Sequence, residues 1–196
     1  MSIVTLVSGG LDSTVMALLA NEEGLTQFPL FIDYGQLGRG RELQACQINF
    51  RRHGLPEPKV ASLGGYGVLL SSGLTDPGKH ILKDAFLPCR NVMFVTVGAA
   101  YAFQCGATSV GIGLLDEAFG LFPDQTRGFL SDAEALLSRS LARSIKLVAP
   151  LMSFSKTDVV RIAKAKKITG TYSCHAGTET PCGVCVACRE YIGLED

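Results

Sequence analysis

The stretch LVSGGLDSTV, residues 6–15, decides how this chain folds. It overlaps an apolar run, residues 3–7, that has the composition of a buried strand and stops at Ser8, Gly9 and Gly10. An apolar helical pattern begins directly after this turn. A turn from a buried strand into a helix presents free backbone N–H groups and the positive end of the helix dipole. Because glycines let an anion approach that backbone closely, the stretch predicts a phosphate site.

Three known loop types fit this turn poorly. A Walker A loop ends in Gly-Lys-Ser/Thr, and the stretch has no lysine. The dinucleotide fingerprint G-x-G-x-x-G is absent. A nucleophile elbow, G-x-S-x-G, needs glycine where Leu6 stands, two residues before Ser8. On physical grounds alone, the alternative is a structural turn in which Asp12 begins the helix.

The composition indicates a compact protein. A chain of 196 residues with 47% hydrophobic side chains is long enough for one domain with its own core. Eighteen basic residues balance eighteen acidic ones, so we expect no direct binding to nucleic acid. No apolar run approaches the roughly 18 residues that cross a bilayer, and the N-terminus lacks a signal-peptide pattern. We therefore expect a cytoplasmic protein without a membrane partner.

Strand-like runs alternate with helical patterns along the chain. Near-continuous apolarity predicts strands buried on both faces at 3–7, 28–34, 59–63, 108–115 and 145–151. Helical patterns occur at 13–23, 40–53, 90–105, 127–143 and 156–167. This alternation predicts an α/β fold, a doubly wound and mostly parallel sheet covered by helices.

Two segments interrupt the alternation. Residues 64–89 are rich in glycine and proline, and residues 116–126 follow a predicted strand. We expect both as loops at the carboxyl edge of the sheet, where α/β proteins bind ligands. In contrast, SKTD, residues 155–158, is typical of a capping box that opens the last predicted helix.

The C-terminal part of the chain has the pattern of a metal site. It holds four of the seven cysteines, Cys174, Cys182, Cys185 and Cys188. Two overlapping C-x-x-C steps and one upstream cysteine provide four thiolates, which favour a structural, tetrahedral Zn²⁺ site. An iron–sulfur cluster and a redox dithiol are the alternatives, and a zinc ribbon that binds a partner has the same spacing. We expect residues 171–196 to form a zinc-binding tail on an α/β domain of residues 1–170.

A histidine and three other cysteines have simpler interpretations. His175 follows the first cysteine of the tail, but four thiolates already satisfy a zinc ion, so we expect His175 to take no part. Cys46, Cys89 and Cys105 lie singly in apolar, helix-like surroundings and are predicted to be small core residues.

The SGGLDS turn resembles the pyrophosphate-binding loop of the PP-loop ATPases, which include GMP synthetase, argininosuccinate synthetase and tRNA-modifying enzymes. In that superfamily the loop holds the β- and γ-phosphates of ATP while the α-phosphate is attacked. The resemblance implies an adenine nucleotide alpha hydrolase-like, Rossmann-like fold and release of pyrophosphate. It also implies that ATP is bound by Ser8, Gly9, Gly10, Leu11, Asp12, Ser13, Asp33 and Tyr34.

Further segments are similar to one PP-loop family, 7-cyano-7-deazaguanine (preQ0) synthase or QueC, of the queuosine and archaeosine pathways. They are DYGQ (33–36) with Glu42 downstream, LPCRN (87–91), FPD (122–124), APLMSFSKTD (149–158) and the cysteine tail. The family's reaction is ATP-dependent C–N bond formation. ATP adenylylates the carboxylate of 7-carboxy-7-deazaguanine, ammonia gives the amide, and a second ATP drives dehydration to the nitrile. AMP and pyrophosphate are released.

The QueC resemblance implies roles for individual residues. Asp12, Lys156 and Arg90 are expected to be catalytic, with Asp12 helping to hold Mg²⁺ with ATP and the two cations binding phosphate or carboxylate. Substrate is expected to contact Gln36, Arg90, Asn91, Asp116, Phe122 and Asp124. The family's habit also implies a homodimer.

Two loops depart from the QueC pattern. LGRGRE (37–42) replaces the usual Arg-His after YGQ, and PDQT (123–126) replaces P-D-C-R, with Arg127 as the nearest arginine. Because both changes fall near the expected substrate, an alternative is a QueC-like paralogue that joins the activated acid to another amine, for example on a protein. Such paralogues are linked to anti-phage defence and DNA modification. A tRNA-modifying PP-loop sulfurtransferase and a non-catalytic, nucleotide-binding zinc scaffold are further alternatives.

Overall fold

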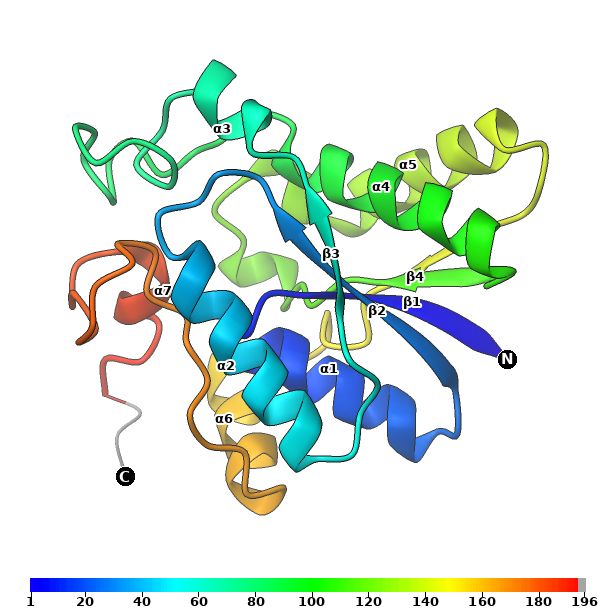
Figure 1. Cartoon of the computed structure of the whole chain (residues 1–196), viewed down its shortest axis with the longest axis horizontal. Helices are drawn as coiled ribbons and strands as arrows, with labels where there is room; N and C mark the ends of the chain where they lie inside the picture. Colours follow the sequence, from blue (N-terminus) through cyan, green and yellow to red (C-terminus); the bar gives the residue numbers. More distant parts are fainter. Residues whose placement is uncertain (194–196) are drawn as a thin grey trace.

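The computed structural model describes residues 1–193, so residues 194–196, the end of the expected tail, lie outside the described part. Within residues 1–193, five parallel strands form one sheet in the order β3-β2-β1-β4-β5 (Figure 1). The strands are β1 (Ser2–Val7), β2 (Thr26–Asp33), β3 (Lys59–Ser62), β4 (Ser109–Gly111) and β5 (Lys146–Val148). The predicted α/β fold with a parallel sheet is confirmed.

Helices cover both faces of the sheet. The longer ones are α1 (Leu11–Glu22), α2 (Arg39–Arg52), α4 (Arg90–Cys105), α5 (Arg127–Ser140) and α6 (Lys156–Ala165). The helices α1, α2 and α6 lie on one face, and α4 and α5 lie on the other (Figure 1). Short elements are α3 (Gly65–Leu69), α7 (Val186–Arg189) and two 3-10 turns, η1 (Glu117–Phe119) and η2 (Pro123–Gln125).

The core has two layers because alternate strand residues face opposite helices. On one face, Val4 of β1 belongs to the same buried cluster as Val95 of α4. On the other face, Phe31 of β2 is buried with Val15 of α1 and Val159 of α6. Burial on both faces explains why the strands read as apolar runs rather than as an alternation.

Strands β4 and β5 are shorter than the sequence predicts. The expected ranges were 108–115 and 145–151, whereas the ladder between the two strands covers three residues of each. The apolar residues that follow are still buried, among them Ile112 and Leu114 after β4 and Leu151 after β5. Their apolarity reflects packing at the carboxyl edge of the sheet, which sequence alone does not separate from strand pairing.

The three single cysteines differ in burial. Cys46 is buried, as predicted. Cys89 is exposed at the residue before α4, and Cys105 is partly exposed in the last turn of that helix, so both predictions were wrong. The buried stripe of α4 ends at Ala102, which leaves its final turn less covered.

The chain order reverses at β1, and this reversal positions the site. From β1 the chain proceeds through β2 to β3 on one side, while β4 and β5 lie on the other side. The connections after β1 and β4 therefore diverge, and ligands of open α/β sheets bind in the crevice outside the carboxyl ends of such strands. The SGGLDS turn lies at this point, between β1 and α1.

The C-terminal segment returns to this turn. The Tyr172 amide donates to the carbonyl of Gly9 at 2.9 Å, and Asn49 of α2 donates to the carbonyl of Gly170 at 3.2 Å. Arg41 of α2 donates to the carbonyl of Gly177 at 3.2 Å. These bonds bring the cysteine-rich tail to the carboxyl edge of the sheet (Figure 1).

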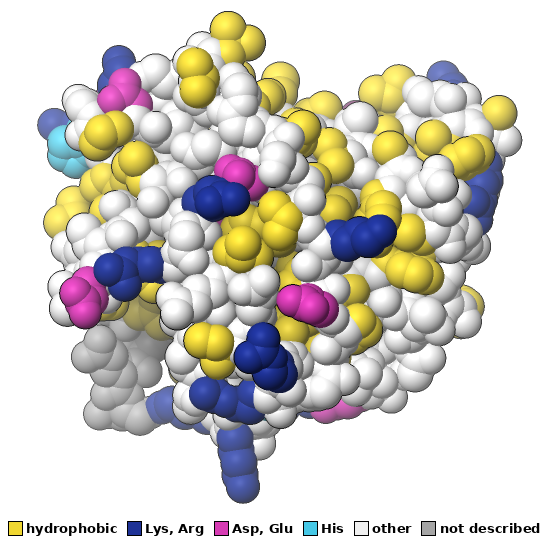
Figure 2. Space-filling model, in the orientation of Figure 1, with side chains coloured by type: hydrophobic (Ala, Val, Ile, Leu, Met, Phe, Trp, Pro, Cys, Tyr) yellow, Lys and Arg dark blue, Asp and Glu magenta, His cyan; other side chains and the backbone are white. Residues whose placement is uncertain are grey.

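The surface agrees with the balanced charge of the chain. Figure 2 shows cationic and anionic side chains dispersed over one face, together with hydrophobic side chains at several points. Val68 and Leu69 of α3 are 87% and 80% exposed. Among residues 1–193, no helix combines the length and the apolarity needed to cross a bilayer.

Gly9 is the position where the turn tolerates no side chain. Its φ is +78°, and a Cβ atom there would overlap the carbonyl oxygen of Glu42 in α2. We expect Gly9→Ala to lower the free energy of unfolding by about 2 kcal/mol or more, because backbone must move in both segments. Urea denaturation followed by circular dichroism measures this loss.

Gly40→Ala is the matched control for Gly9→Ala. Gly40 lies in α2, and a Cβ atom there would meet nothing within 4 Å. We expect it to be neutral or to stabilise by about 0.5–1 kcal/mol, as alanine favours a helix over glycine. Equal effects of the two substitutions would contradict the close approach at Gly9.

Candidate functional site

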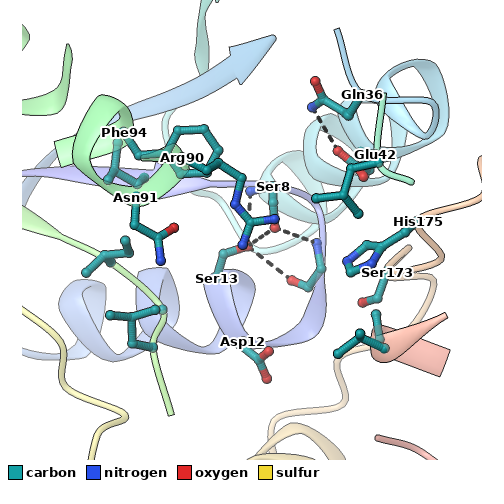
Figure 3. Close-up of a pocket in the computed structure, with 18 of the residues that line it drawn as sticks. Ser8, Asp12, Ser13, Gln36, Glu42, Arg90, Asn91, Phe94, Ser173 and His175 are labelled. Carbon is teal, nitrogen blue, oxygen red and sulfur yellow. Dashed lines mark hydrogen bonds between the residues drawn. The ribbon is translucent and has the colours of Figure 1, made fainter. Parts of the chain in front are cut away.

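A cavity of about 270 Å³ lies at the carboxyl edge of the sheet. Its wall includes the turn after β1, the end of β2, the start of α4, the segment that contains η1 and η2, and the C-terminal tail. Figure 3 shows side chains from these separate segments directed into it. The predicted site residues that line it are Ser8, Gly10, Asp12, Ser13, Tyr34, Gln36, Arg90, Asn91, Phe122 and Lys156.

Three predicted nucleotide-binding residues lie outside this lining. Gly9 faces α2, and Leu11 is buried among core residues beneath α1. The Asp33 carboxylate accepts a hydrogen bond from Arg39 Nε at 2.5 Å and a second from the Gly35 amide at 3.1 Å. The structure thus gives Asp33 partners in its own loop and the next helix.

Two predicted substrate-binding residues also lie outside the lining. Asp116 accepts a hydrogen bond from the Ala118 amide at 2.9 Å and so caps η1. Asp124 accepts from the Asn91 amide at 3.2 Å, while Asn91 Nδ2 donates to the Asp124 carbonyl at 3.0 Å. Asp124 therefore holds Asn91, which does line the cavity, at the start of α4.

The turn offers donors for an anion. Gly10 stands at the N-cap of α1, where it has no side chain to accept from the first-turn N–H groups. Its φ of −75° is open to any residue, so of the two glycines only Gly9 needs the left-handed region. The Ser8 and Ser13 hydroxyls lie 3.2 Å apart beside it. Two hydroxyls, several free N–H groups and a helix dipole make this end of α1 suited to a phosphate.

Lys156 and Asp12 meet across 144 residues of sequence. The predicted capping box is present, with Ser155 and Asp158 bonded reciprocally, and it starts α6 at Lys156. Lys156 Nζ lies 2.8 and 2.9 Å from the two carboxylate oxygens of Asp12. Burial opposes the charge on Lys156, but Asp12 and Glu190 overcome it and raise the lysine pKa above its usual value. Lys156 therefore stays charged.

Arg90 supplies a second cation from the opposite face of the sheet. It is the first residue of α4, and its guanidinium lies 5.8 Å from the ring centre of Phe94. Figure 3 shows it extending into the cavity, toward the turn that carries Ser8 and Ser13. Two cations on separate helices thus face a turn suited to anions.

A buried carboxyl group lies between β2 and α2. Glu42 is 8% exposed and accepts a hydrogen bond from Gln36 Nε2 at 3.0 Å. Gln36 Oε1 accepts from the Tyr34 amide at 3.0 Å, which fixes the amide's orientation. Burial raises the pKa of Glu42 to about 7, against the lowering effects of Gln36 and Arg90. This carboxyl group can exchange a proton near neutral pH.

Sequence reasoning missed several tail residues that line the cavity, including Tyr172, Ser173, His175 and Glu190. His175, predicted to take no part in the metal site, is not in the cysteine cluster but points into the cavity beside Ser173 (Figure 3). Its Nδ1 atom is buried with no hydrogen-bond partner within residues 1–193, and burial lowers its pKa to about 4. The C-x-x-C spacing alone gave no signal that the tail returns to the turn.

The four tail cysteines form one cluster. Their sulfur atoms all lie within 4.8 Å of one another. The backbone amides of Cys182, Cys185 and Cys188 donate to the sulfurs of the preceding cysteines at 3.3, 3.3 and 3.4 Å. Burial opposes ionisation of Cys174, but hydrogen bonds from the Cys182 amide, the Thr178 hydroxyl and the Ala176 amide lower its pKa to about 6. Metals bind thiolates, so this donor set fits a tetrahedral ion.

Comparison with known proteins identifies the family. The sequence profile described as "Queuosine biosynthesis protein QueC" matches residues 2–191. The chain belongs to the QueC family. A relative named 7-cyano-7-deazaguanine synthase from Methanothrix thermoacetophila is 31% identical over 201 residues, covering 95% of this chain and 90% of the relative. Another relative of that name, from Persephonella marina, is 32% identical over 217 residues, which cover 100% of this chain and 95% of the relative.

Solved structures share the fold of this QueC-family chain. The U34-tRNA thiolase NcsA from Methanococcus maripaludis with its 4Fe–4S cluster has a TM-score of 0.61 at 21% identity, covering 88% of this chain and 59% of that one. NMN synthetase from Francisella tularensis has a TM-score of 0.56 at 17% identity, covering 91% and 68%. At these identities the likeness establishes the fold alone.

The buried Glu42 makes the stability of this QueC-family protein depend on pH. Its pKa is raised from 4.5 to about 7 in the folded state, so between these values the folded chain binds more protons than the unfolded one. The stability contributed by Glu42 therefore falls as pH rises through this window. We expect the free energy of unfolding of Glu42→Gln, relative to wild type, to increase by about 1–3 kcal/mol across it.

Urea denaturation at a series of pH values measures this difference. Glu57→Gln, at an exposed position, is the matched control and is expected to follow the wild type at every pH. A Glu42→Gln curve parallel to that of the wild type would contradict the raised pKa.

Proposed function

We propose that this QueC-family chain is a 7-cyano-7-deazaguanine synthase that uses ATP to convert 7-carboxy-7-deazaguanine and ammonia into the nitrile. The observation that supports this most strongly is the convergence, in one cavity, of an anion-binding turn with the cations Arg90 and Lys156. The names of the relatives support the same reaction. We further propose that residues 1–170 form the nucleotide domain and residues 171–196 its metal-binding tail.

The first step activates the acid. The first-turn N–H groups of α1, with Ser8 and Ser13, bind the outer phosphates of ATP. A carboxylate oxygen of the substrate attacks the α-phosphorus, a new P–O bond forms, and pyrophosphate leaves. Lys156 and Arg90 stabilise the charge that grows on the phosphates. The product is an acyl-adenylate, whose AMP group leaves far more readily than oxide from a carboxylate.

The second step forms the amide. Ammonia attacks the acyl carbon, the C–N bond forms, and AMP departs with the electron pair of the C–O bond. The nitrogen loses a proton in this step. We assign its uptake to Glu42, which lines the cavity and whose pKa of about 7 suits proton transfer near neutrality.

The third step consumes a second ATP. The amide oxygen attacks the α-phosphorus and releases pyrophosphate, and the nitrogen gives up one proton to form an imidoyl adenylate. This adenylate loses AMP and the second nitrogen proton to give the nitrile. Mg²⁺ bound with ATP would neutralise phosphate charge, and Asp12 is the carboxylate at the turn that would hold it. Each nitrile therefore requires two molecules of ATP and yields two of AMP.

A second candidate, the paralogue that uses another amine, is favoured by the loop at residues 123–126. Gln125 Oε1 accepts from the amides of Leu121 and Phe122 at 2.8 and 2.9 Å, so this side chain closes the loop itself. Arg127 donates to the carbonyl of Met152 at 2.7 Å and is not in the cavity lining. Its guanidinium group also donates to the Ser153 hydroxyl at 3.3 Å and so bonds to the segment before α6 rather than lining the cavity. A protein-borne amine is then an alternative acceptor.

The function is tested with purified protein, MgATP, 7-carboxy-7-deazaguanine and ammonium, followed by mass spectrometry of bases and nucleotides. We expect the nitrile with two AMP per molecule. Lys156→Met should slow AMP formation by about 100-fold or more, because a cation at the phosphates is lost. Lys164→Met, on the exposed side of α6, should leave the rate unchanged. AMP without nitrile would favour the paralogue, and no AMP would favour a scaffold.

We propose that the tail cluster holds a structural zinc ion. Purified protein is expected to contain one zinc per chain and to lack the visible absorption of an iron–sulfur cluster. Cys182→Ser should lose most of the metal and unfold at a lower temperature, since metal binding and folding of such a tail are coupled. Cys89→Ser, at an exposed cysteine outside the cluster, should keep the metal content and the unfolding temperature of the wild type. Stoichiometric iron with visible absorption would overturn the zinc assignment.

We also propose that the chain forms a homodimer. The exposed apolar side chains Val68 and Leu69 of α3 support a contact at this short helix. Analytical sedimentation of the wild type at several concentrations tests the oligomeric state, and a homodimer is expected to sediment with twice the mass of one chain.

A further inference from the structure

We propose that Glu190 is a positioning residue for Lys156, by which the cysteine tail holds the lysine ammonium at the nucleotide turn. Glu190 Oε2 lies 3.0 Å from Lys156 Nζ, and Glu190 is part of the cavity wall. The inference rests on the role of Lys156 in the proposed function. It assigns the support of Lys156 in part to Glu190, which lies two residues after the last cysteine of the tail.

The ammonium group of Lys156 has two carboxylate partners. Its Nζ atom donates hydrogen bonds to both oxygens of Asp12 and forms an ion pair with one oxygen of Glu190. The ring of Tyr191 lies 4.8 Å from Nζ on a further side. The lysine side chain is only 12% exposed. The Glu190 side chain is itself 40% exposed, so Glu190 reaches the enclosed ammonium group from the open edge of the cavity.

Two carboxylates, those of Asp12 and Glu190, are paired with the single ammonium group of Lys156. Glu190 can therefore hold Lys156 in place when Asp12 takes another partner. If Asp12 turns toward phosphates and their metal ion when ATP binds, Lys156 loses two of its partners. Glu190 and the ring of Tyr191 come from the other side, the tail, and are free to keep Nζ in place. Lys156 then meets the phosphates without having to be ordered again during the reaction.

The cysteine cluster determines where Glu190 lies. Glu190 directly follows α7, whose N-cap is Cys185 and whose third residue is Cys188. The amide of Glu190 donates to the carbonyl of Val186 at 3.2 Å, so the residue continues the turn of that helix. A metal ion bound by the four cysteines would fix the tail that presents Glu190 to the cavity, and Glu190 would connect this tail to the nucleotide turn through Lys156.

A measurement that needs no substrate tests the contact. Acylation of a lysine requires the neutral, accessible amine, so ion pairs to an ammonium group whose side chain is only 12% exposed should protect Lys156 from an amine-reactive ester. We expect Glu190→Gln to speed the labelling of Lys156 by about fivefold, as read by peptide mass spectrometry. Arg189→Gln, a neighbouring change at an exposed residue outside the lining, should leave the labelling as in wild type. Unchanged labelling in Glu190→Gln would overturn the proposal.

Metal content separates positioning from damage to the tail. Glu190→Gln is expected to bind as much metal per chain as wild type. If it loses metal, Glu190→Asp takes its place as the test, since it keeps the charge but shortens the reach. Faster labelling of Lys156 in a metal-replete Glu190→Asp supports the contact, and wild-type labelling in it would count against positioning.

A double-mutant cycle with Lys156→Met then tests the effect on AMP formation. We expect Glu190→Gln to lower kcat about tenfold while KM for ATP stays the same or falls, because a carboxylate near the phosphates is removed. In the Lys156→Met background, Glu190→Gln should have no further effect on kcat. A loss of equal size in both backgrounds would overturn positioning. If the wild type itself forms no AMP, the proposed function fails while the labelling still decides the contact.

Discussion

The rest of the structure depends on the close approach of the Gly9 backbone to the carbonyl of Glu42. The turn after the central strand β1 packs so tightly on α2 that no Cβ atom fits between them. The same residue accepts the Tyr172 amide of the returning tail through its own carbonyl. One glycine therefore joins the central strand, the second helix and the C-terminal segment, because only a bare backbone can be approached from both sides.

The cavity beside this turn brings charged side chains together. Lys156 is enclosed and paired with Asp12 and the more exposed Glu190, and Arg90 reaches in from the other face of the sheet. Glu42 is buried, and no cation of residues 1–193 forms a hydrogen bond with it. Its carboxyl group therefore holds a proton up to about neutral pH. The cavity thus combines fixed cations for phosphates with one acid whose charge can change. This combination suits a reaction that moves both phosphate and protons.

The tail is a wall of the cavity and also carries a four-cysteine cluster that can hold a metal ion. Ser173 and His175 enter the lining near the first cysteine, and Glu190 enters after the last one. A metal ion that holds the four thiolates together would also hold these side chains against the turn. This arrangement explains how a short segment with few buried apolar residues can contribute to the geometry of the site.

Features that depend on residues close together in the chain could be predicted from the sequence. Which side chains face one another across the cavity could not. The SGGLDS turn, the alternation of strands and helices, the capping box at Ser155 and the cysteine spacing each depend on neighbours a few residues apart. Resemblance to a family brought Lys156, Arg90 and Asn91 into consideration, and all three line the cavity. Asp116 and Asp124 instead bond to nearby amides, because carboxylates at turns serve as caps equally well. The meeting of Lys156 with Glu190, and the entry of His175, required the tail to fold back on Gly9, a contact that only the packing of distant segments determines.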